Sequence, residues 1–315
     1  MPETTRPIDS VLLIGFGGPT RPEDVMPFLR LVAQGRGVPG ERLQAVAHHY
    51  DAVGGRSPYN DLPRMQALDL ERWLALRGHP LPVHVGMRNW HPFLAETIRT
   101  MMDGGRRHAA GVILSAHRSE TSWERYMQDV SRAIETAGGG PAVSYLSPWL
   151  DAPGFLEAAA QRIEQVSGLR RGAWPVEVPL IFTAHSIPEP MARRSPYVAD
   201  LRASCDGVAR ILRVRADGWR LAYQSRSGDG RVPWLGPDML DALRDCAAAG
   251  ARSVVIQAIG FLIDHVEVLY DLDVEAALLA ASLGMTFHRA PCVNSHPEFV
   301  AMLGERILTM AGGAG

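Results

Sequence analysis

Eight short apolar segments recur along the chain, each followed by residues whose apolar positions have helical spacing. They span residues 10–15, 82–86, 111–116, 142–146, 179–184, 220–224, 253–258 and 286–290. The segments are rich in aliphatic and β-branched residues and alternate little, which is typical of strands buried on both faces. Strands that alternate with helices favour parallel pairing. The pattern therefore predicts an α/β fold built from parallel sheets.

The two halves of the chain resemble each other. Residues 153–163 (PGFLEAAAQRI) align with 297–307 (PEFVAMLGERI), and 83–88 (VHVGMR) align with 221–226 (LAYQSR). A tandem similarity of this kind predicts two Rossmann-like units, each a doubly wound sheet of four strands. We expect one unit over residues 1–150 and the other over 151–315, with a ligand cleft between them.

An additional stretch, about residues 20–69, separates the first two predicted strands. Its residues 48–61 (HHYDAVGGRSPYND) are rich in Gly, Pro, Ser and Asn, so we expect a loop there rather than a part of the core. Insertions at the carboxyl ends of parallel strands often shape a ligand crevice. We therefore expect residues 20–69 to line the cleft.

The composition excludes several classes of function. Apolar residues make up 46% and charged residues 21% of the 315 residues, and the formal net charge is −2, so neither nucleic acid nor an anionic membrane is an expected main partner. The chain has no lysine, and all 32 basic residues are arginine. This excludes a Schiff-base lysine and the lysine of a phosphate-binding loop.

Three cysteines, Cys205, Cys246 and Cys292, are widely spaced and odd in number. They argue against a disulfide framework and a structural zinc site, and they are too few for a four-thiolate iron–sulfur cluster. No apolar run reaches the roughly 20 residues of a transmembrane helix. We expect a protein of a reducing compartment, the cytoplasm, with neither a transmembrane segment nor an iron–sulfur cluster.

A glycine-rich segment, residues 15–19 (GFGGP), follows the first predicted strand. It is not a GxGxxG fingerprint, Pro19 removes an amide donor, and no acidic residue follows at the spacing of a ribose partner. A dinucleotide site is a weaker interpretation than a tight turn at the end of the strand.

His185 lies in residues 183–188 (TAHSIP), directly after an apolar strand segment. The carboxyl ends of parallel strands are where such sheets bind ligands. A neutral imidazole accepts a proton near neutral pH or ligates a metal ion. The alternative is a satisfied, partly buried histidine, and the position at a strand end favours the functional interpretation.

Acidic residues follow the seventh apolar segment at regular spacing. Glu267, Asp271 and Glu275 are four residues apart, which aligns them on one helical face, and Asp264 is expected to extend the row by a turn. Like charges at this spacing disfavour a helix, so the row needs a reason. A solvated acidic face is one explanation. The other is the handling of a divalent cation, for which carboxylates are suitable ligands.

Four segments together resemble the ferrochelatase family. They are residues 183–188, 261–273 (FLIDHVEVLYDLD), 223–237 (YQSRSGDGRVPWLGP) and 49–58 (HYDAVGGRSP), and the resemblance covers about residues 9–308. It implies a lyase of haem biosynthesis that inserts Fe²⁺ into a porphyrin and releases two protons. It also implies two Rossmann-like domains around a porphyrin cleft, with their terminal helices, 153–166 and 297–310, exchanged.

The resemblance also implies roles for individual residues. His185 and Glu267 stand at the catalytic and metal-binding positions. Phe16, Ser57 and Tyr126 stand at porphyrin-contact positions, and Phe16 replaces a tyrosine that several relatives have. Asp271 and Glu275 match an acidic row that is expected to relay metal. Fe²⁺ is then a substrate, and no tightly bound cofactor is expected.

Residues 12–19 (LLIGFGGP) and 88–92 (RNWHP) are most similar to the coproporphyrin III ferrochelatases of Gram-positive bacteria, which implies a monomer. With no lysine available, the extra propionates of that substrate would need arginines, helix N-termini or hydroxyls as donors, and the candidate arginines are Arg56, Arg118, Arg125 and Arg226. Residues 115–126 (SAHRSETSWERY) depart from the family pattern, and Glu120 adds charge there. The alternatives are protoporphyrin IX as substrate, a chelatase for cobalt or nickel and another tetrapyrrole, or a non-catalytic porphyrin- or haem-binding carrier.

Overall fold

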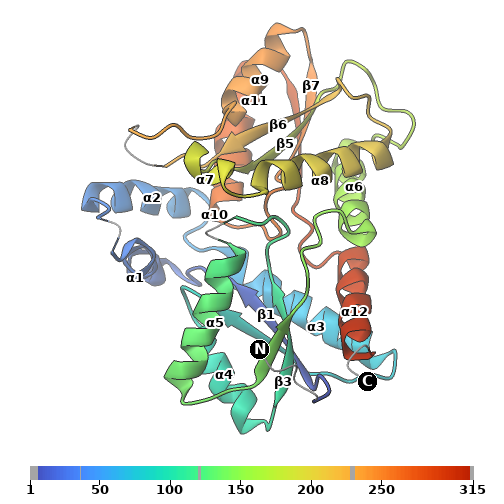
Figure 1. The fold of residues 1–315 in the computed structure, drawn as a ribbon. Helices are drawn as coiled ribbons and strands as arrows, with labels where there is room; N and C mark the ends of the chain where they lie inside the picture. The colour runs from blue at the N-terminus through green and yellow to red at the C-terminus, as the bar shows by residue number, and fades with distance from the viewer. Residues whose placement is uncertain (1–5, 36, 120–121, 228–230, 313–315) are drawn as a thin grey trace. The chain divides into compact units, whose positions relative to one another are not determined.

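The strands form two parallel sheets of four strands each, with the orders β2-β1-β3-β4 and β6-β5-β7-β8. Figure 1 draws the strands as arrows among their helices. The structure is a computed structural model and describes residues 6–35, 37–119, 122–227 and 231–312. The strands are β1 (Ser10–Gly15), β2 (Val83–Met87), β3 (His108–Ile113), β4 (Ala142–Tyr145), β5 (Leu180–His185), β6 (Trp219–Gln224), β7 (Ser253–Gln257) and β8 (Thr286–Ala290). The predicted α/β class with two doubly wound parallel sheets is confirmed.

Helices connect these strands. Those before β5 are α1 (Pro22–Ala33), α2 (Gly40–Ala52), η1 (Pro58–Asn60), α3 (Asp61–Ala75), α4 (Leu94–Asp103), α5 (Trp123–Ala137) and α6 (Pro153–Ser167). Those after β5 are α7 (Glu189–Arg193), α8 (Tyr197–Leu212), α9 (Met239–Ala248), α10 (Val266–Val268), η2 (Leu269–Ala276), α11 (Ala277–Ser282) and α12 (Pro297–Gly312).

Each apolar segment of the sequence corresponds to a strand, and the largest shift is at β3. We expect this strand at 111–116, whereas it spans 108–113. The small side chains of Ala109 and Ala110 carry little hydrophobic signal, but their backbone pairs with β1 on one side and β4 on the other. Gly111 suits this central position because a Cβ atom there would lie 2.6 Å from the Val143 side chain.

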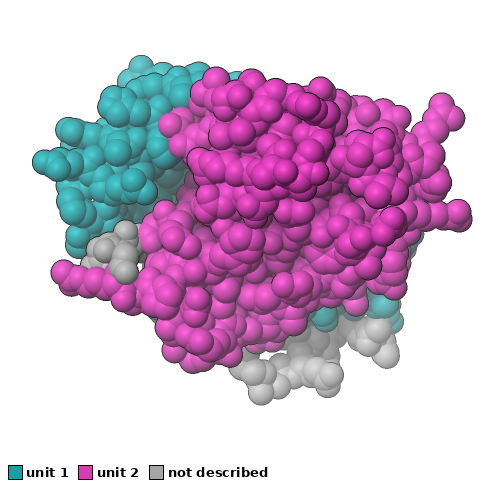
Figure 2. Space-filling view, turned by 90° about the horizontal axis from the view of Figure 1, so that it is seen from above, with its two compact units in different colours: residues 1–115, 121–148, 295–315 teal, residues 116–120, 149–294 magenta. Residues whose placement is uncertain are grey.

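The chain divides into two compact units, coloured separately in Figure 2. Unit 1 comprises residues 1–115, 121–148 and 295–315, and unit 2 comprises 116–120 and 149–294. Helix α12 follows the last strand of unit 2 in sequence but belongs to unit 1, where it packs against α3. Helix α6 follows the last strand of unit 1 but belongs to unit 2, where it packs against α8. In their own units, α3 and α8 both join the first strand to the second.

Most of the insertion at 20–69 is helical, which corrects the expected loop at 48–61. Helix α2 continues to Ala52, η1 spans Pro58–Asn60, and α3 starts at Asp61. Tyr50, Ser57 and Asn60 are buried rather than solvated. The glycines and Pro58 confine the irregular backbone to the few residues between α2 and η1, where Gly54 and Gly55 have positive φ.

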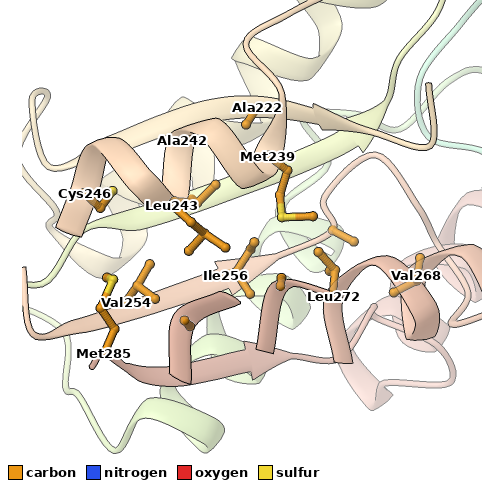
Figure 3. Close-up of a cluster of buried hydrophobic side chains, with 14 of the residues drawn as sticks. Ala222, Met239, Ala242, Leu243, Cys246, Val254, Ile256, Val268, Leu272 and Met285 are labelled. Atoms are coloured by element: carbon orange, nitrogen blue, oxygen red, sulfur yellow. The ribbon is translucent and has the colours of Figure 1, made fainter. Parts of the chain in front are cut away.

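Unit 2 has a core beneath the helices that carry the acidic residues. Val268 and Leu272 pack with Ile256 of β7 and Leu243 of α9 (Figure 3). Ala276 belongs to the same cluster, and all five side chains are buried. The apolar side of the acidic segment is therefore fixed against the sheet. Its carboxylates project from the remaining sides.

Candidate active site

His185 is the last residue of β5, where its backbone and its ring are both held. Its carbonyl accepts a hydrogen bond from the Tyr197 hydroxyl at 3.0 Å, and its Nδ1 donates to the Ser186 carbonyl at 2.5 Å. Because Nδ1 must carry a proton to donate, the neutral ring has its lone pair on Nε2. The structure therefore leaves Nε2 as the ring atom of His185 that can accept a proton or ligate a metal ion.

Glu267 faces that atom from the start of the acidic segment. The Glu267 Oε2 lies 3.9 Å from His185 Nε2, and the two side chains are 46% and 33% exposed. This separation is too long for a hydrogen bond. It is shorter than the sum, about 4.2 Å, of typical bonds from a divalent ion to nitrogen and to oxygen. One divalent cation arriving from solvent can therefore contact both atoms.

His265 caps the short helix that carries Glu267. Its Nδ1 accepts a hydrogen bond from the Glu267 backbone N–H at 3.2 Å. Burial lowers the pKa of His265, with Glu267 and Asp264 acting in the opposite direction. A neutral ring keeps the Nδ1 lone pair available, so the cap is maintained.

Asp271 lies in η2, is buried (7% exposed), and contacts the last residue of β6, Gln224. Its Oδ2 accepts hydrogen bonds from Gln224 Nε2 at 3.0 Å and from the Ser225 hydroxyl at 2.5 Å. Gln224 in turn accepts a hydrogen bond from the Thr183 hydroxyl of β5 at 2.7 Å. Burial, with smaller contributions from Glu267 and Glu275, raises the pKa of Asp271 to about 7. This carboxyl exchanges its proton near neutral pH.

The acidic row differs from the predicted one in three respects. Residues 269–276 form a π-helix rather than an α-helix, and exposure varies along the row, because Asp271 is buried while Glu275 is exposed. Asp264 does not extend the row, and this part of the prediction is wrong. The helix begins only after His265, and Asp264 lies in the preceding turn, where it pairs with Arg289.

In unit 1 the glycine-rich segment 15–19 is held by side chains rather than open to an anion. The Phe16 N–H donates to the Tyr59 hydroxyl and the Gly18 N–H to Asn60 Oδ1, both at 2.9 Å. Gly17 has φ +88° and a Cβ there would lie 3.0 Å from the Trp90 backbone nitrogen, so only glycine fits. Two amides that could cradle a phosphate are thus already used, which agrees with the weak dinucleotide interpretation.

The three residues that the sequence predicts as porphyrin contacts all lie in unit 1. Phe16 is partly buried, with its ring 6.3 Å from that of Phe28 in an edge-to-face arrangement. Ser57 is buried, and its hydroxyl accepts a hydrogen bond from the Tyr59 N–H. Tyr126 is buried, and the Arg88 guanidinium carbon lies 5.7 Å from the centre of its ring.

The arginines named for propionate binding are largely exposed. Arg56 lies 3.5 Å from Asp61, and Arg125 lies 3.5 Å from Asp129. Arg118 and Arg226 in unit 2 are exposed. Glu120 and residues 228–230 of the 223–237 signature lie outside the described residues.

Sequence reasoning missed several supporting residues, namely His265, Gln224, Ser225, Tyr59, Asn60 and Arg289. Gln224 ends a strand segment and His265 lies inside a quoted motif, so position alone marked both as candidates. Arg289 had no local signal, because its partners are distant in sequence.

No group of three or more His, Cys, Asp or Glu side chains within the described ranges is arranged to hold a metal ion. In the same ranges, no helix combines the length and the apolar character needed to cross a membrane.

Comparisons with known proteins agree on one family. The ferrochelatase family model matches residues 9–311. The coproporphyrin III ferrochelatase of Mycolicibacterium smegmatis is 41% identical over 309 residues, covering 97% of this chain and 90% of that protein. A ferrochelatase of Rhodopirellula baltica is 40% identical over 299 residues, covering 94% of this chain and 84% of that protein.

Solved structures add agreement on the fold. SirB from Bacillus subtilis with Fe³⁺ has a TM-score of 0.58 at 12% identity and covers 98% of this chain and 97% of that one. DR2241 from Deinococcus radiodurans, described as similar to chelatases, has a TM-score of 0.53 at 16% identity and covers 98% of this chain and 56% of that one. At such identities the likeness concerns the fold alone. The family model and the 41% identity over most of the sequence show that this chain belongs to the ferrochelatase family.

Proposed function

We propose that this ferrochelatase uses coproporphyrin III as its porphyrin and that His185 and Glu267 carry the chemistry. Insertion of Fe²⁺ into a porphyrin, a lyase reaction of haem biosynthesis, follows from the family. The single observation behind the residue assignment is the accessible pair formed by His185 Nε2 and Glu267 Oε2, 3.9 Å apart.

The reaction must remove two protons from pyrrole nitrogens and replace the water ligands of Fe²⁺ by four nitrogens. His185 Nε2 has its lone pair available and is the proposed proton acceptor. Glu267 is the proposed iron ligand beside it. A site with two protein donors suits a substrate ion, because a full set of ligands would hold the iron too tightly to release it to the macrocycle.

Asp271 and Glu275 are the proposed relay that supplies metal to this pair. The pKa of Asp271 is raised by burial first, with Glu267 contributing, and the pKa of the exposed Glu275 is raised by partial desolvation, with Asp238 contributing. With a pKa of about 7, the Asp271 carboxyl is protonated for part of the time at neutral pH and holds a divalent cation less tightly than a permanently ionised carboxylate does. A relay requires that each carboxylate bind the metal ion weakly, so that the ion can pass on to the next one.

Phe16, Ser57 and Tyr126 are the proposed porphyrin-contact residues of unit 1. The partly buried Phe16 offers an aromatic ring for stacking on the macrocycle. Ser57 and Tyr126 are buried, and the Ser57 N–H donates to the carbonyl of Pro19, so Ser57 also holds the glycine-rich segment in place.

Replacing Phe16 by alanine should weaken porphyrin binding, measured by fluorescence quenching without metal. Unchanged binding would remove Phe16 from the contact set.

Two observations favour coproporphyrin III: the names of similar proteins, and the presence of arginine without lysine in the chain. Two similar mycobacterial enzymes are named coproporphyrin III ferrochelatases, at 41% identity each. Four propionates need more cationic partners than the two of protoporphyrin IX, and a guanidinium binds a carboxylate with two parallel hydrogen bonds. Arg118 and Arg226 are exposed and are among the proposed partners of the propionates.

We also propose that the protein is a cytoplasmic monomer without a tightly bound cofactor or an iron–sulfur cluster. The three cysteines are buried and unpaired, and burial raises the pKa of each thiol, which disfavours the thiolates that a cluster needs. Iron and sulfide analysis of purified protein tests the absence of a cluster, and the mass in solution from light scattering tests the monomeric state. A stoichiometric iron–sulfide content or a dimer mass would contradict them.

The residue assignment is tested by His185→Ala and Glu267→Gln. Both variants should lose nearly all iron insertion, while porphyrin binding without metal stays within about tenfold of wild type, because the proton acceptor and the metal ligand are removed and the porphyrin contacts are kept. His288→Ala is the matched control, since His288 is also a partly buried histidine of unit 2 whose Nδ1 contacts a backbone carbonyl. Wild-type turnover in either site variant would exclude that residue.

The substrate assignment is tested by anaerobic initial rates with coproporphyrin III and protoporphyrin IX side by side. We expect a higher kcat/KM for coproporphyrin III and many turnovers per enzyme. Equal or faster use of protoporphyrin IX would refute the assignment. A shift of the Soret band that stops at one equivalent would instead indicate a carrier.

A further inference from the structure

Arg289, near the end of β8, joins two carboxylates that flank the catalytic segment, residues 265–272, which contains Glu267. Its Nη1 lies 2.9 Å from Asp264 Oδ1, and its Nε and Nη2 lie 2.7 and 2.6 Å from the two oxygens of Asp273. The Arg289 side chain is 15% and the Asp264 side chain 11% exposed. Two nitrogens of one planar guanidinium thus bind Asp273, and the third binds Asp264.

Asp264 is fixed by further hydrogen bonds to the chain that follows β8. Its Oδ2 accepts from Asn294 Nδ2 at 2.7 Å, and its backbone N–H donates to Asn294 Oδ1 at 3.0 Å. The Cys292 N–H also donates to Asp264 Oδ1, at 3.3 Å. The turn before the catalytic segment is therefore tied to residues 289–294 by several bonds at once, which restricts its backbone to one position.

This turn sets the position of Glu267. Asp264 directly precedes His265, whose ring accepts the Glu267 N–H and whose carbonyl accepts the Leu269 N–H at 2.9 Å. A shift of Asp264 would move this cap and with it Glu267. Asp273 anchors the other end, two residues from both Asp271 and Glu275 and hence on a different side of the helix.

The same arrangement divides the acidic side chains into two sets. Residues 264–275 contain five carboxylates, Asp264, Glu267, Asp271, Asp273 and Glu275. Mutual repulsion within so short a segment disfavours its folding. Arg289 neutralises Asp264 and Asp273 and makes no ion pair with Glu267, Asp271 or Glu275 in the described part of the chain.

From this geometry we propose that Arg289 is a positioning residue for iron insertion, which sets the distance between Glu267 and His185 by holding Asp264 and Asp273 together. The proposal rests on the proposed role of Glu267. It gives Asp264 and Asp273 a structural role, although both lie in the acidic sequence motif at residues 261–273.

The test compares Arg289→Met with Arg171→Met. Arg171 is the matched control because it also pairs with two carboxylates of unit 2, Glu157 and Glu164, at 2.6 and 2.8 Å. Both substitutions should lower the thermal midpoint, since each leaves two carboxylates without their cation. Only Arg289→Met should lower kcat/KM for Fe²⁺, by about tenfold or more, with the KM for porphyrin within about twofold of wild type.

Arg289→Lys refines the test, because lysine keeps the charge but cannot replace the three-nitrogen contact. It should recover most of the stability of wild type while keeping a lowered kcat/KM for Fe²⁺. If Arg289→Met does not fold, Asp273→Asn replaces it and should lower kcat/KM for Fe²⁺ by about threefold.

Metal kinetics of Arg289→Met equal to those of Arg171→Met would overturn the proposal, as would unaltered metal kinetics in Asp273→Asn where that variant is needed. If the proposed role of Glu267 is wrong, the result is different. In that case Glu267→Gln inserts iron normally, whatever the Arg289 variants do.

Discussion

At the scale of single residues, Asp271 links the site to the stability of unit 2. It is buried, and its Oδ2 accepts two hydrogen bonds. Burial nevertheless outweighs these bonds and raises its pKa to about 7. The folded protein therefore binds this proton more tightly than the unfolded chain, whose aspartates titrate near pH 4. Between those two pH values folding takes up a proton.

This proton uptake predicts a pH dependence of stability. Because the unfolded chain carries fewer protons on Asp271 between about pH 4 and 7, the free energy of unfolding falls as the pH rises through that interval. Asp271→Asn removes the contribution, and asparagine Oδ1 can still accept both hydrogen bonds. The variant should be more stable than wild type at pH 8, by up to a few kcal/mol, and this advantage should shrink as the pH falls to 5, by about 1.4 kcal/mol per pH unit inside the interval.

Thermal or urea unfolding of metal-free protein at the two pH values measures this effect. Asp241→Asn, at an exposed aspartate on α9 that pairs with Arg244, is the control. A variant whose stability follows the same pH curve as wild type would show that Asp271 ionises in the folded protein as it does in the unfolded chain.

At the scale of elements, the acidic segment shows where spacing informs and where it misleads. A spacing of four residues predicts one helical face, and the buried Val268 and Leu272 confirm an apolar side packed on the sheet. The burial of Asp271 and the separate place of Asp264 depend on contacts with residues of β6 and β8. Local periodicity contains no information about those strands.

The proposed relay gives an element-scale prediction. If Asp271 and Glu275 pass metal to Glu267, the double variant Asp271→Asn with Glu275→Gln should raise the KM for Fe²⁺ more than the KM for porphyrin, because only metal encounters the row. Steady-state rates over a range of Fe²⁺ concentrations measure this. An unchanged metal dependence would make the row a solvated helix face.

Gly304 yields a second prediction at this scale. Glycine inside a helix usually gains about 0.5–1 kcal/mol of stability on replacement by alanine. In α12, however, a Cβ at position 304 would lie 2.3 Å from Trp73 Cε3, and the Arg77 guanidinium carbon lies 3.6 Å from the centre of the same indole. Gly304→Ala should therefore destabilise the protein, by about 1–3 kcal/mol.

Gly312→Ala is the control for this substitution, because it lies in the same helix and its Cβ would have nothing within 4 Å. Chemical denaturation of both variants decides the sign. Stabilisation of Gly304→Ala would mean that α12 and α3 separate easily.

At the scale of the whole molecule, the chain repeats one topology twice. Each unit has a parallel sheet in which the first strand lies between the second and the third. Each is completed by a helix that follows the other unit's last strand in sequence, α12 in unit 1 and α6 in unit 2. The alignment of residues 153–163 with 297–307 marks these two helices as equivalent.

Charge on the whole molecule gives the last prediction. If exposed arginines bind the extra propionates of coproporphyrin III, the preference for this substrate over protoporphyrin IX should weaken with rising salt, because exposed ion pairs are screened. The ratio of the two kcat/KM values, measured at low and at high ionic strength, tests this. A ratio independent of salt would indicate that other groups select the porphyrin.

The sequence by itself determined the eight strands, the parallel α/β class, the family and the position of His185 at a strand end. Each of these depends on local signals: continuous apolar segments, short motifs and residues that directly follow a strand. The roles assigned to Glu267, Phe16, Ser57 and Tyr126 remain predictions that the experiments above test.

Only the tertiary structure decided which carboxylates are available. Asp264 and Asp273 pair with Arg289, while Asp271 is enclosed by Gln224 and Ser225. The partners in these contacts are 16 to 47 positions apart in sequence. Burial and ion pairing depend on which strands become neighbours in the sheet, and a linear pattern of charges cannot specify this.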